Sequence, residues 1–219
     1  MSLIYEATTL TKILFILITA VSAYFLGCFN GAVIVSKYIL RDDIRTHGSG
    51  NAGLTNFYRV FGGPLTLVVI LTDVLKAVIA TLIGSFLATR IGFTADQGVI
   101  FAGVFCMLGH VFPCMFGFKG GKGILSGGTI AFMLDWRVAV IAWGGFIIFS
   151  VLTRWVSLGS IVAAILFPLA AAIILHDPIV TVLSIICGLL ILWKHRENMK
   201  RILHGEESKF SVHKKKEDK

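Results

Sequence analysis

Residues 118–128 read FKGGKGILSGG, and this short stretch lies between two strongly apolar runs. It places Lys119 and Lys122 among five glycines. Glycine lets a backbone approach a ligand closely, and consecutive N–H groups that lead into a helix N-terminus form an anion site, to which a lysine adds a full charge. The stretch is therefore interpreted either as a phosphate-binding loop at the start of a membrane helix or as a turn whose lysines only set topology. The spacing Gly-x-x-x-x-Gly-Lys-Ser/Thr of nucleotide P-loops is absent.

The composition is that of a membrane protein. The chain has 219 residues, of which 56% are hydrophobic and 15% charged, and its mean hydropathy of +0.87 is far above that of soluble domains. We expect a single transmembrane domain over residues 1–205, followed by a basic cytoplasmic tail over 206–219. The formal charge is +8, but no aromatic-interleaved basic patch or soluble module is present, so nucleic-acid binding is not expected.

The four cysteines lie in or beside apolar segments, and no two of them form a Cys-x-x-Cys pair. This pattern predicts reduced core thiols and no metal site. The residues concerned are Cys28, Cys106, Cys114 and Cys187.

A membrane-spanning helix needs about 20 apolar residues. Six segments approach this requirement, namely 11–29, 65–88, 97–116, 138–153, 157–175 and 179–193. A seventh apolar segment, 124–134, is too short to cross about 30 Å of hydrocarbon by itself.

The distribution of positive charge decides whether the short segment crosses. If it crosses and the N-terminus is outside, 16 of the 20 Lys and Arg residues fall on the inner side and three on the outer side. The positive-inside rule strongly favours this arrangement. We therefore predict an all-α bundle of seven transmembrane helices, one of them short, with the N-terminus outside and the C-terminus cytoplasmic. The glycine loop then lies partly within the membrane, where irregular backbone is tolerated only if it lines a cavity or is buried in protein.

A second polar stretch, residues 47–62, reads HGSGNAGLTNFYRVFG. Hydroxyl and amide side chains can donate to phosphate oxygens, and an arginine such as Arg59 can do so bidentately. The same residue types also favour turns, so a capped linker is the alternative. The candidate ligand-binding residues here are Gly48, Ser49, Gly50, Asn51, Thr55 and Asn56.

A third polar stretch follows the last apolar segment and reads LWKHRENMKRILHGEESKF over residues 192–210. It is either part of the same site or a juxtamembrane helix whose basic side chains meet lipid headgroups. His195 is the best candidate for chemistry among the six histidines. His110 ends a span and is more typical of a buried core histidine.

Asp73 and Lys76 lie within the second apolar segment, three residues apart and therefore on one helical face. Ionisable groups in a span usually face the bundle interior or a wet cavity. Two interpretations stay open: a structural ion pair, or direct contact with a substrate.

The segments GSGNAGLTNFYR, GHVFPCMFGFKGGKG and HRENMKRILHGEE, in this order, resemble those of the bacterial membrane acyl-phosphate:glycerol-3-phosphate acyltransferases. The resemblance implies transfer of a fatty acyl group from acyl-phosphate to the 1-hydroxyl of glycerol 3-phosphate, giving 1-acylglycerol 3-phosphate (lysophosphatidic acid) and phosphate at the start of phospholipid synthesis. It also implies no cofactor, metal or acyl-CoA, and a site on the cytoplasmic side of the bacterial plasma membrane. We expect a monomer whose partners are its two substrates and membrane lipid.

The same resemblance, together with the residue chemistry, assigns the site. The catalytic candidates are Ser49, Arg59, Lys122, His195 and Asn198. The substrate-binding candidates are Gly48, Gly50, Asn51, Thr55, Asn56, His110, Lys119, Gly120, Gly121, Gly123, Arg201 and Glu207. Leu54, Cys28 and the ILSGG that follows the glycine loop depart from the usual residues of the family, which concerns packing and acyl-chain preference.

Two questions stay open at this point. The base that takes the proton of the glycerol hydroxyl is either His195 or the phosphate of the substrate, and the neighbouring Arg196 and Arg201 favour a binding role for His195. The alternative function is a transporter or channel for a phosphorylated solute, with Asp73 and Lys76 as pathway charges. Internal repeats would favour a transporter, and none is seen between the two halves of the chain.

Overall fold

The computed structural model describes residues 8–210, and this part of the chain is helical, without strands. The α-helices are α1 (Thr9–Cys28), α2 (Gly31–Ile34), α3 (Leu54–Val60), α4 (Leu65–Arg90), α5 (Ala95–Val111), α6 (Ile124–Leu134), α7 (Trp136–Thr153), α8 (Val156–Leu175), α9 (Pro178–Lys194) and α10 (Arg196–Leu203). A π-helical turn (Val35–Ile39) and two 3₁₀ turns (Ile44–Thr46 and Cys114–Phe116) complete the described elements. Residues 211–219 of the predicted tail lie outside the described part.

The prediction of an all-α membrane fold is confirmed. Each of the seven predicted apolar segments corresponds to one helix, and α6 has the predicted limits. Within residues 8–210, five helices are long and apolar enough to span a membrane, or six if α9 and α10, which meet at a bend of 55°, are taken as one span. The third predicted segment, 97–116, ends earlier than expected as an α-helix, because Pro113 has no N–H to continue the helical hydrogen bonds.

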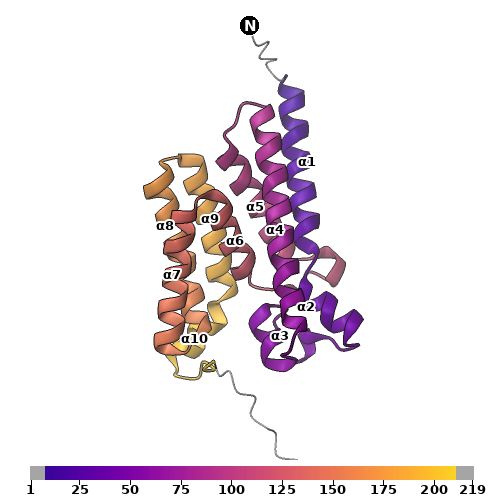
Figure 1. The fold of residues 1–219 in the computed structure, drawn as a ribbon, viewed down its shortest axis with the longest axis vertical. Coiled ribbons are helices and arrows are strands. Elements are labelled where there is room, and N and C mark those ends of the chain that lie inside the picture. The colour runs from indigo at the N-terminus through magenta and orange to yellow at the C-terminus, as the bar shows by residue number, and fades with distance from the viewer. Residues whose placement is uncertain (1–7, 211–219) are drawn as a thin grey trace, which may run out of the picture.

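The helices form two groups with α6 between them (Figure 1). In the first group, α5 packs against α1 and α4, with the short helices α2 and α3 below them. In the second group, α8 packs between α7 and α9, with α10 below. Helix α6 contacts α4 and α5 on one side and α7 on the other, so the loop that precedes it runs between the two groups.

Small residues let α5 approach its neighbours at backbone distance. A Cβ atom added to Gly98 would come within 2.3 Å of the carbonyl oxygen of Gly84 on α4. A Cβ added to Gly109 would come within 2.1 Å of the carbonyl oxygen of Tyr24 on α1. Such small-residue contacts are the usual means of helix association in lipid, where apolar side chains gain little by leaving the hydrocarbon.

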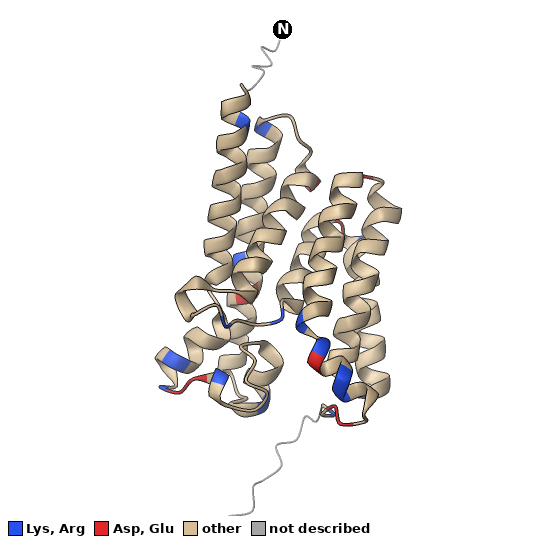
Figure 2. Cartoon of the chain, turned by 180° about the vertical axis from the view of Figure 1, so that it is seen from behind, with Lys and Arg blue, Asp and Glu red and all other residues tan. Residues whose placement is uncertain are grey.

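Charged residues gather at one end of the bundle, around α2, α3 and α10, whereas the long helices carry few charges (Figure 2). The outward faces of the long helices expose large apolar side chains such as Leu71, Phe86 and Leu152. This combination of an apolar belt and one strongly charged end is the surface of an integral membrane protein.

Candidate active site

The three polar segments meet at one cavity of about 1280 Å³ at the charged end of the bundle. All five predicted catalytic residues line it, namely Ser49, Arg59, Lys122, His195 and Asn198. The predicted substrate-binding residues that line it are Gly48, Asn51, Thr55, Asn56, His110, Gly123, Arg201 and Glu207. Four others do not line it: Gly50, Lys119, Gly120 and Gly121.

The first polar loop is held in shape by Asn56, which is buried. Its side-chain oxygen accepts a hydrogen bond from the N–H of Ser49 at 3.0 Å. Its amide group donates to the carbonyls of Asn51, His47 and Ile44 at 3.0, 3.1 and 3.3 Å. Asn56 thus folds the loop back on itself, and its polar atoms are occupied within the chain.

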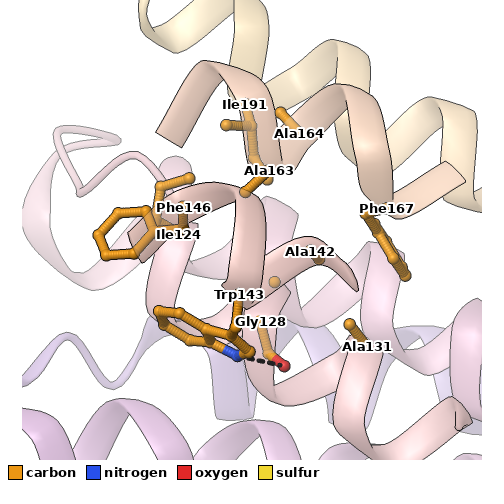
Figure 3. A pocket seen from close by; sticks show the side chains of 11 residues that line it. Ile124, Gly128, Ala131, Ala142, Trp143, Phe146, Ala163, Ala164, Phe167 and Ile191 are labelled. Atoms are coloured by element: carbon orange, nitrogen blue, oxygen red, sulfur yellow. Dashed lines mark hydrogen bonds between the residues drawn. The ribbon is translucent and has the colours of Figure 1, made fainter. Parts of the chain in front are cut away.

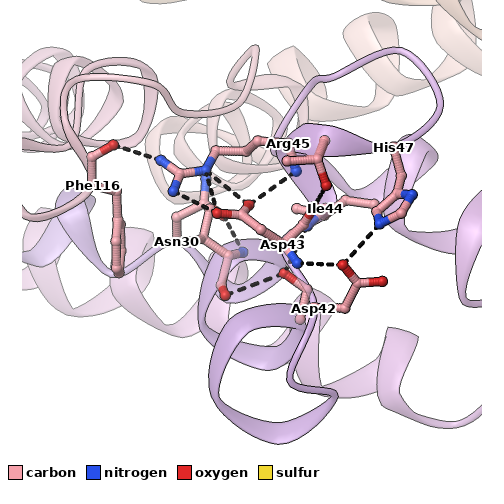
Figure 4. Close-up of polar contacts among 10 residues, drawn as sticks. Asn30, Asp42, Asp43, Ile44, Arg45, His47 and Phe116 are labelled. Carbon is pink, nitrogen blue, oxygen red and sulfur yellow. Dashed lines mark hydrogen bonds and ion pairs between the residues drawn. The ribbon is translucent and has the colours of Figure 1, made fainter.

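Arg45 joins this loop to the segment that leads into the glycine loop (Figure 4). Its guanidinium lies 2.7 Å from Asp43 and donates to the carbonyl of Phe116 at 2.6 Å. The hydrogen bond from Arg45 lowers the pKa of Asp43 to about 2. In the same loop His47 Nε2 lies 2.8 Å from Asp42. The first and second polar segments are therefore tied together outside the cavity.

The glycine loop packs tightly on His110. A Cβ added to Gly121 would lie only 2.2 Å from His110 Nε2 and 2.9 Å from the carbonyl oxygen of Ala52. This close approach admits no side chain at position 121. The next residue, Lys122, extends from the loop and donates a hydrogen bond to the side-chain oxygen of Asn198. Burial and the charge of Arg201 lower the pKa of Lys122 to about 8.

Glu207 organises the third segment. Its carboxylate accepts hydrogen bonds from Ser157 (2.7 Å), Asn198 (2.8 Å) and Arg201 (2.8 Å). Burial raises the pKa of Glu207, but these three hydrogen bonds outweigh burial and the net pKa is below its ordinary value. The backbone carbonyl of Glu207 also accepts from Trp155 at 3.1 Å. The chain after α10 is thereby fastened across the start of α8.

His195 lies between α9 and α10, where the chain bends, and it is buried. Its Nδ1 is 2.8 Å from the carbonyl oxygen of Ile191. A carbonyl oxygen only accepts, so Nδ1 carries the proton and Nε2 is left as an acceptor. Burial and the charge of Lys122 lower the pKa of His195 to about 4. The ring is therefore neutral at physiological pH.

Asp73, Lys76 and His110 form a buried polar group at the floor of the cavity, to which Asp73 and His110 contribute lining atoms. Lys76 Nζ lies 2.7 Å from Asp73 and 2.8 Å from His110 Nδ1. Both interpretations of Asp73 and Lys76 are therefore compatible with the structure. The two side chains form an ion pair with each other, and the group that they form with His110 also borders the cavity.

A small apolar pocket of about 20 Å³ adjoins the cavity and shares Ile124, Trp143 and Phe146 with it (Figure 3). The indole N–H of Trp143 donates to the carbonyl of Gly128 at 3.3 Å. A Cβ added to Gly128 would lie 2.4 Å from the indole ring, so glycine at this position lets Trp143 lie against α6.

Sequence reasoning missed several contributors to the site. Ser157 and Trp155 hold Glu207, and Trp143 and Phe146 line the cavity. A serine or an aromatic residue near the end of an apolar run is common in any membrane helix, so no local pattern marked them. The sequence did single out Asp73 and Lys76, but gave no sign of their contact with His110, which is distant in the chain.

The arrangement suits anionic ligands. Arg59, Lys122 and Arg201 each come from a different polar segment and line one cavity together with the amide and hydroxyl groups of Asn51, Thr55 and Ser49. Such groups bind phosphate oxygens by charge-assisted hydrogen bonds. The apolar side chains of Leu125, Trp143 and Phe146 line the same cavity.

Comparison with known proteins agrees with this geometry. The family described as glycerol-3-phosphate acyltransferase matches residues 17–205. A glycerol-3-phosphate acyltransferase of Thermoanaerobacter pseudethanolicus is 39% identical over 90% of this chain and 96% of its own length. One of Finegoldia magna is 34% identical over 90% and 97%.

Two solved structures are also similar. They are crystal structures of PlsY (YgiH), an integral membrane glycerol 3-phosphate acyltransferase, in its glycerol 3-phosphate form and in its lysophosphatidic acid form. Their TM-scores are 0.81 and 0.78, at 33% and 32% identity, and each match covers 90% of this chain and 96% of the other. On these matches, and on the convergence of the three polar segments at one cavity, the chain belongs to the glycerol-3-phosphate acyltransferase family of integral membrane proteins.

Proposed function

We propose that this protein transfers a fatty acyl group from an acyl-phosphate to the 1-hydroxyl of glycerol 3-phosphate, in the bacterial plasma membrane. The hydroxyl oxygen attacks the acyl carbonyl carbon, the bond from that carbon to the phosphate oxygen breaks, and inorganic phosphate leaves. The product, 1-acylglycerol 3-phosphate, enters phospholipid synthesis. Family membership supports this reaction over transport of a phosphorylated solute.

The observation that carries the proposal is the placing of three cations around one cavity. Arg59, Lys122 and Arg201 come from three separate segments, and both proposed substrates carry a phosphate. An acyl-phosphate also brings its own good leaving group. What the protein must supply is therefore binding, orientation and stabilisation of negative charge as it develops.

Lys122 is the proposed centre of this electrostatic stabilisation. It is fixed by the side chain of Asn198, which Glu207 in turn holds. Glu207 is proposed to act by anchoring Asn198 and Arg201 rather than by touching phosphate, because a carboxylate repels a phosphate and its oxygens already accept three hydrogen bonds. Lys119 is exposed and outside the cavity lining, so we propose no contact between it and substrate.

His195 is proposed to orient the acceptor. Its Nε2 is free to accept a hydrogen bond from a glycerol hydroxyl, since Nδ1 donates to Ile191. A pKa of about 4 makes the ring a weak base. The phosphate of the acceptor is a better base, with a second pKa near 6. We therefore assign proton removal to the substrate phosphate.

The membrane arrangement is proposed to comprise seven spans, including α6, with the N-terminus outside. The gathering of charges at the end that carries the cavity supports a cytoplasmic site by the positive-inside rule (Figure 2). The exposed apolar faces of the long helices then contact lipid. The apolar pocket beside Trp143, with a volume of about 20 Å³, has room for about one water molecule. The acyl chain therefore requires either movement of Trp143 or a path along the helix surface.

The donor is tested with the purified protein, glycerol 3-phosphate and either palmitoyl-phosphate or palmitoyl-CoA. We expect lysophosphatidic acid from palmitoyl-phosphate only, measured by thin-layer chromatography or mass spectrometry. Product from palmitoyl-CoA at an equal rate would contradict the proposed donor. Uptake of glycerol 3-phosphate into proteoliposomes without any product would instead support the transporter.

The two lysines of the glycine loop form a matched pair. Lys122→Ala should lower kcat/KM by about 100-fold or more, because a charge-assisted contact in a partly dry site is lost. Lys119→Ala, five positions before the start of α6, should stay within about threefold of the wild type, since exposed charges contribute little. Because the pKa of Lys122 is about 8, wild-type kcat/KM should also fall as the pH rises above about 8. Equal and mild losses of kcat/KM in both variants would mean that the two lysines only set the membrane topology.

His195→Ala separates orientation from base catalysis. If His195 orients the acceptor, KM for glycerol 3-phosphate should rise by about tenfold or more, and the acidic limb of the pH–rate profile, near pH 6, should persist because it belongs to the substrate phosphate. The measurement is kcat and KM between pH 5 and 9. A fall in kcat with unchanged KM, accompanied by loss of that acidic limb, would make His195 the base.

Topology is tested by single cysteines in a background without the four native ones. A membrane-impermeant maleimide added to intact cells should label His176→Cys, between α8 and α9, and should spare Ser208→Cys, after α10. Both positions are exposed in the structure, and permeabilised cells, in which both should react, are the control. Labelling of Ser208→Cys from outside would exclude the seven-span arrangement.

A further inference from the structure

The buried ammonium group of Lys76 has three hydrogen-bond donors and three acceptors around it. Nζ lies 2.7 Å from Asp73 Oδ1, 2.8 Å from His110 Nδ1 and 3.0 Å from the carbonyl oxygen of Phe29. The side chains of Asp73, Lys76 and His110 are only 2–4% exposed. An ammonium donates hydrogen bonds and accepts none. Lys76 donates to His110 Nδ1 and to the carbonyl of Phe29, while Asp73 Oδ1, which accepts no hydrogen bond among residues 8–210, balances its charge as an ion-pair partner.

The contact with Lys76 determines where His110 carries its proton. Since Lys76 can only donate, His110 Nδ1 must accept, and the ring proton is then on Nε2. Asp73 Oδ1 lies 3.6 Å from Nδ1, which is too long for a hydrogen bond that would place the proton there instead. With the Nδ1 lone pair engaged, the ring has no site for a second proton and stays neutral.

The free N–H of His110 belongs to a side chain that lines the cavity. His110 lines the cavity, and its Nε2 packs against Gly121 of the glycine loop. Among residues 8–210, no hydrogen bond from Nε2 to another residue is formed. The carbonyl of His110 accepts from the N–H of Gly121 at 3.1 Å, which fixes the loop relative to the ring. The ring therefore presents one neutral donor next to Lys122.

We propose that Asp73 and Lys76 are positioning residues, which hold His110 in the form protonated at Nε2 so that it donates to an oxygen of the acyl-phosphate that gains negative charge during transfer. This rests on the proposed function. Asp73 orients Lys76, Lys76 sets the proton on His110, and His110 touches the substrate.

The energetics of the pair agree with such a role. The desolvation free energy of a buried ion pair is about as large as the attraction between its two charges. An apolar pair of the same size would therefore stabilise the bundle equally well. Donors that are fixed before the reaction, by contrast, lower the barrier because they need no reorganisation. Asp73 and Lys76 are therefore expected to raise the reaction rate and to add little to the stability of the fold.

A double-mutant cycle tests the proposal. The charge-neutral pair Asp73→Asn/Lys76→Met leaves no buried charge unpaired, and His110→Phe removes the donor. We expect His110→Phe to lower kcat by about 10²–10³-fold and the paired change to lower it by at least about tenfold, as misplacing a histidine proton does. Combining all three changes should leave kcat at the level of His110→Phe alone. A combined loss equal to the product of the separate losses would mean that the pair acts independently of His110, and would overturn the proposal.

Thr81→Val on α4 is the matched control. Thr81 is equally buried on the same helix, and its hydroxyl donates only to Ala77 and Val78 of that helix, so we expect kcat within about twofold of the wild type. A loss from Thr81→Val as large as that from the charged pair would show general sensitivity of α4 and would also overturn the proposal.

A measurement without substrate separates this inference from the proposed reaction. Nitrogen NMR of the ¹⁵N-histidine-labelled wild type is compared with His110→Phe, whose missing signals belong to His110. We expect a bare Nδ1 and a protonated Nε2. A proton on Nδ1, or on both nitrogens, would refute the role of Lys76 even if the protein makes lysophosphatidic acid. The expected tautomer in a protein that makes no product would instead refute the proposed function alone.

Discussion

The site depends on the close approach of α5 to α1 and α4. Gly98 and Gly109 bring the α5 backbone into contact with both neighbours, at distances that any side chain would prevent. His110, one residue after Gly109, is thereby placed against Lys76 of α4, which also donates to the carbonyl of Phe29 at the end of α1. In a lipid environment, where apolar association is weak, these contacts between small residues and one buried polar group define how the three helices meet.

Two sets of residues form the cavity: those that face it and those that hold the facing residues in place. Residues that face the open space, such as Lys122 and His195, are held by residues whose polar atoms are already used within the chain. Asn56 shapes the first loop, Arg45 ties it to the second, and Glu207 fastens the third. Because these supports are hydrogen-bonded and largely buried, the facing groups lose little freedom on binding, which is the condition for orienting the two proposed substrates, each of which carries a phosphate.

The sequence predicted those features of the fold that depend on a single local property, such as the length of an apolar run. The length of the apolar runs predicted every long helix, and the shortness of residues 124–134 predicted α6 with its correct limits. The polar segments were also identified as parts of one site. What the sequence could not supply was which polar atoms are free to bind a ligand. Asn56 and Glu207, both taken as substrate-binding candidates, line the cavity, yet their polar atoms bind their own chain. Ser157 and the link from Lys76 to His110 depend on contacts between distant segments, for which no local pattern exists.

The position of Glu207 has a consequence for how the protein is made. Its carboxylate and backbone carbonyl hold Asn198, Arg201, Ser157 and Trp155, and it follows every helix in the described chain. A ribosome that makes the helices in order therefore completes the first two polar segments long before the third can close over them. During synthesis the half-built cavity is an open basic surface without its acidic anchor. The cavity is complete only once residue 207 has been made, so a chain that stops before Glu207 lacks the carboxylate that holds Asn198, Arg201 and Ser157.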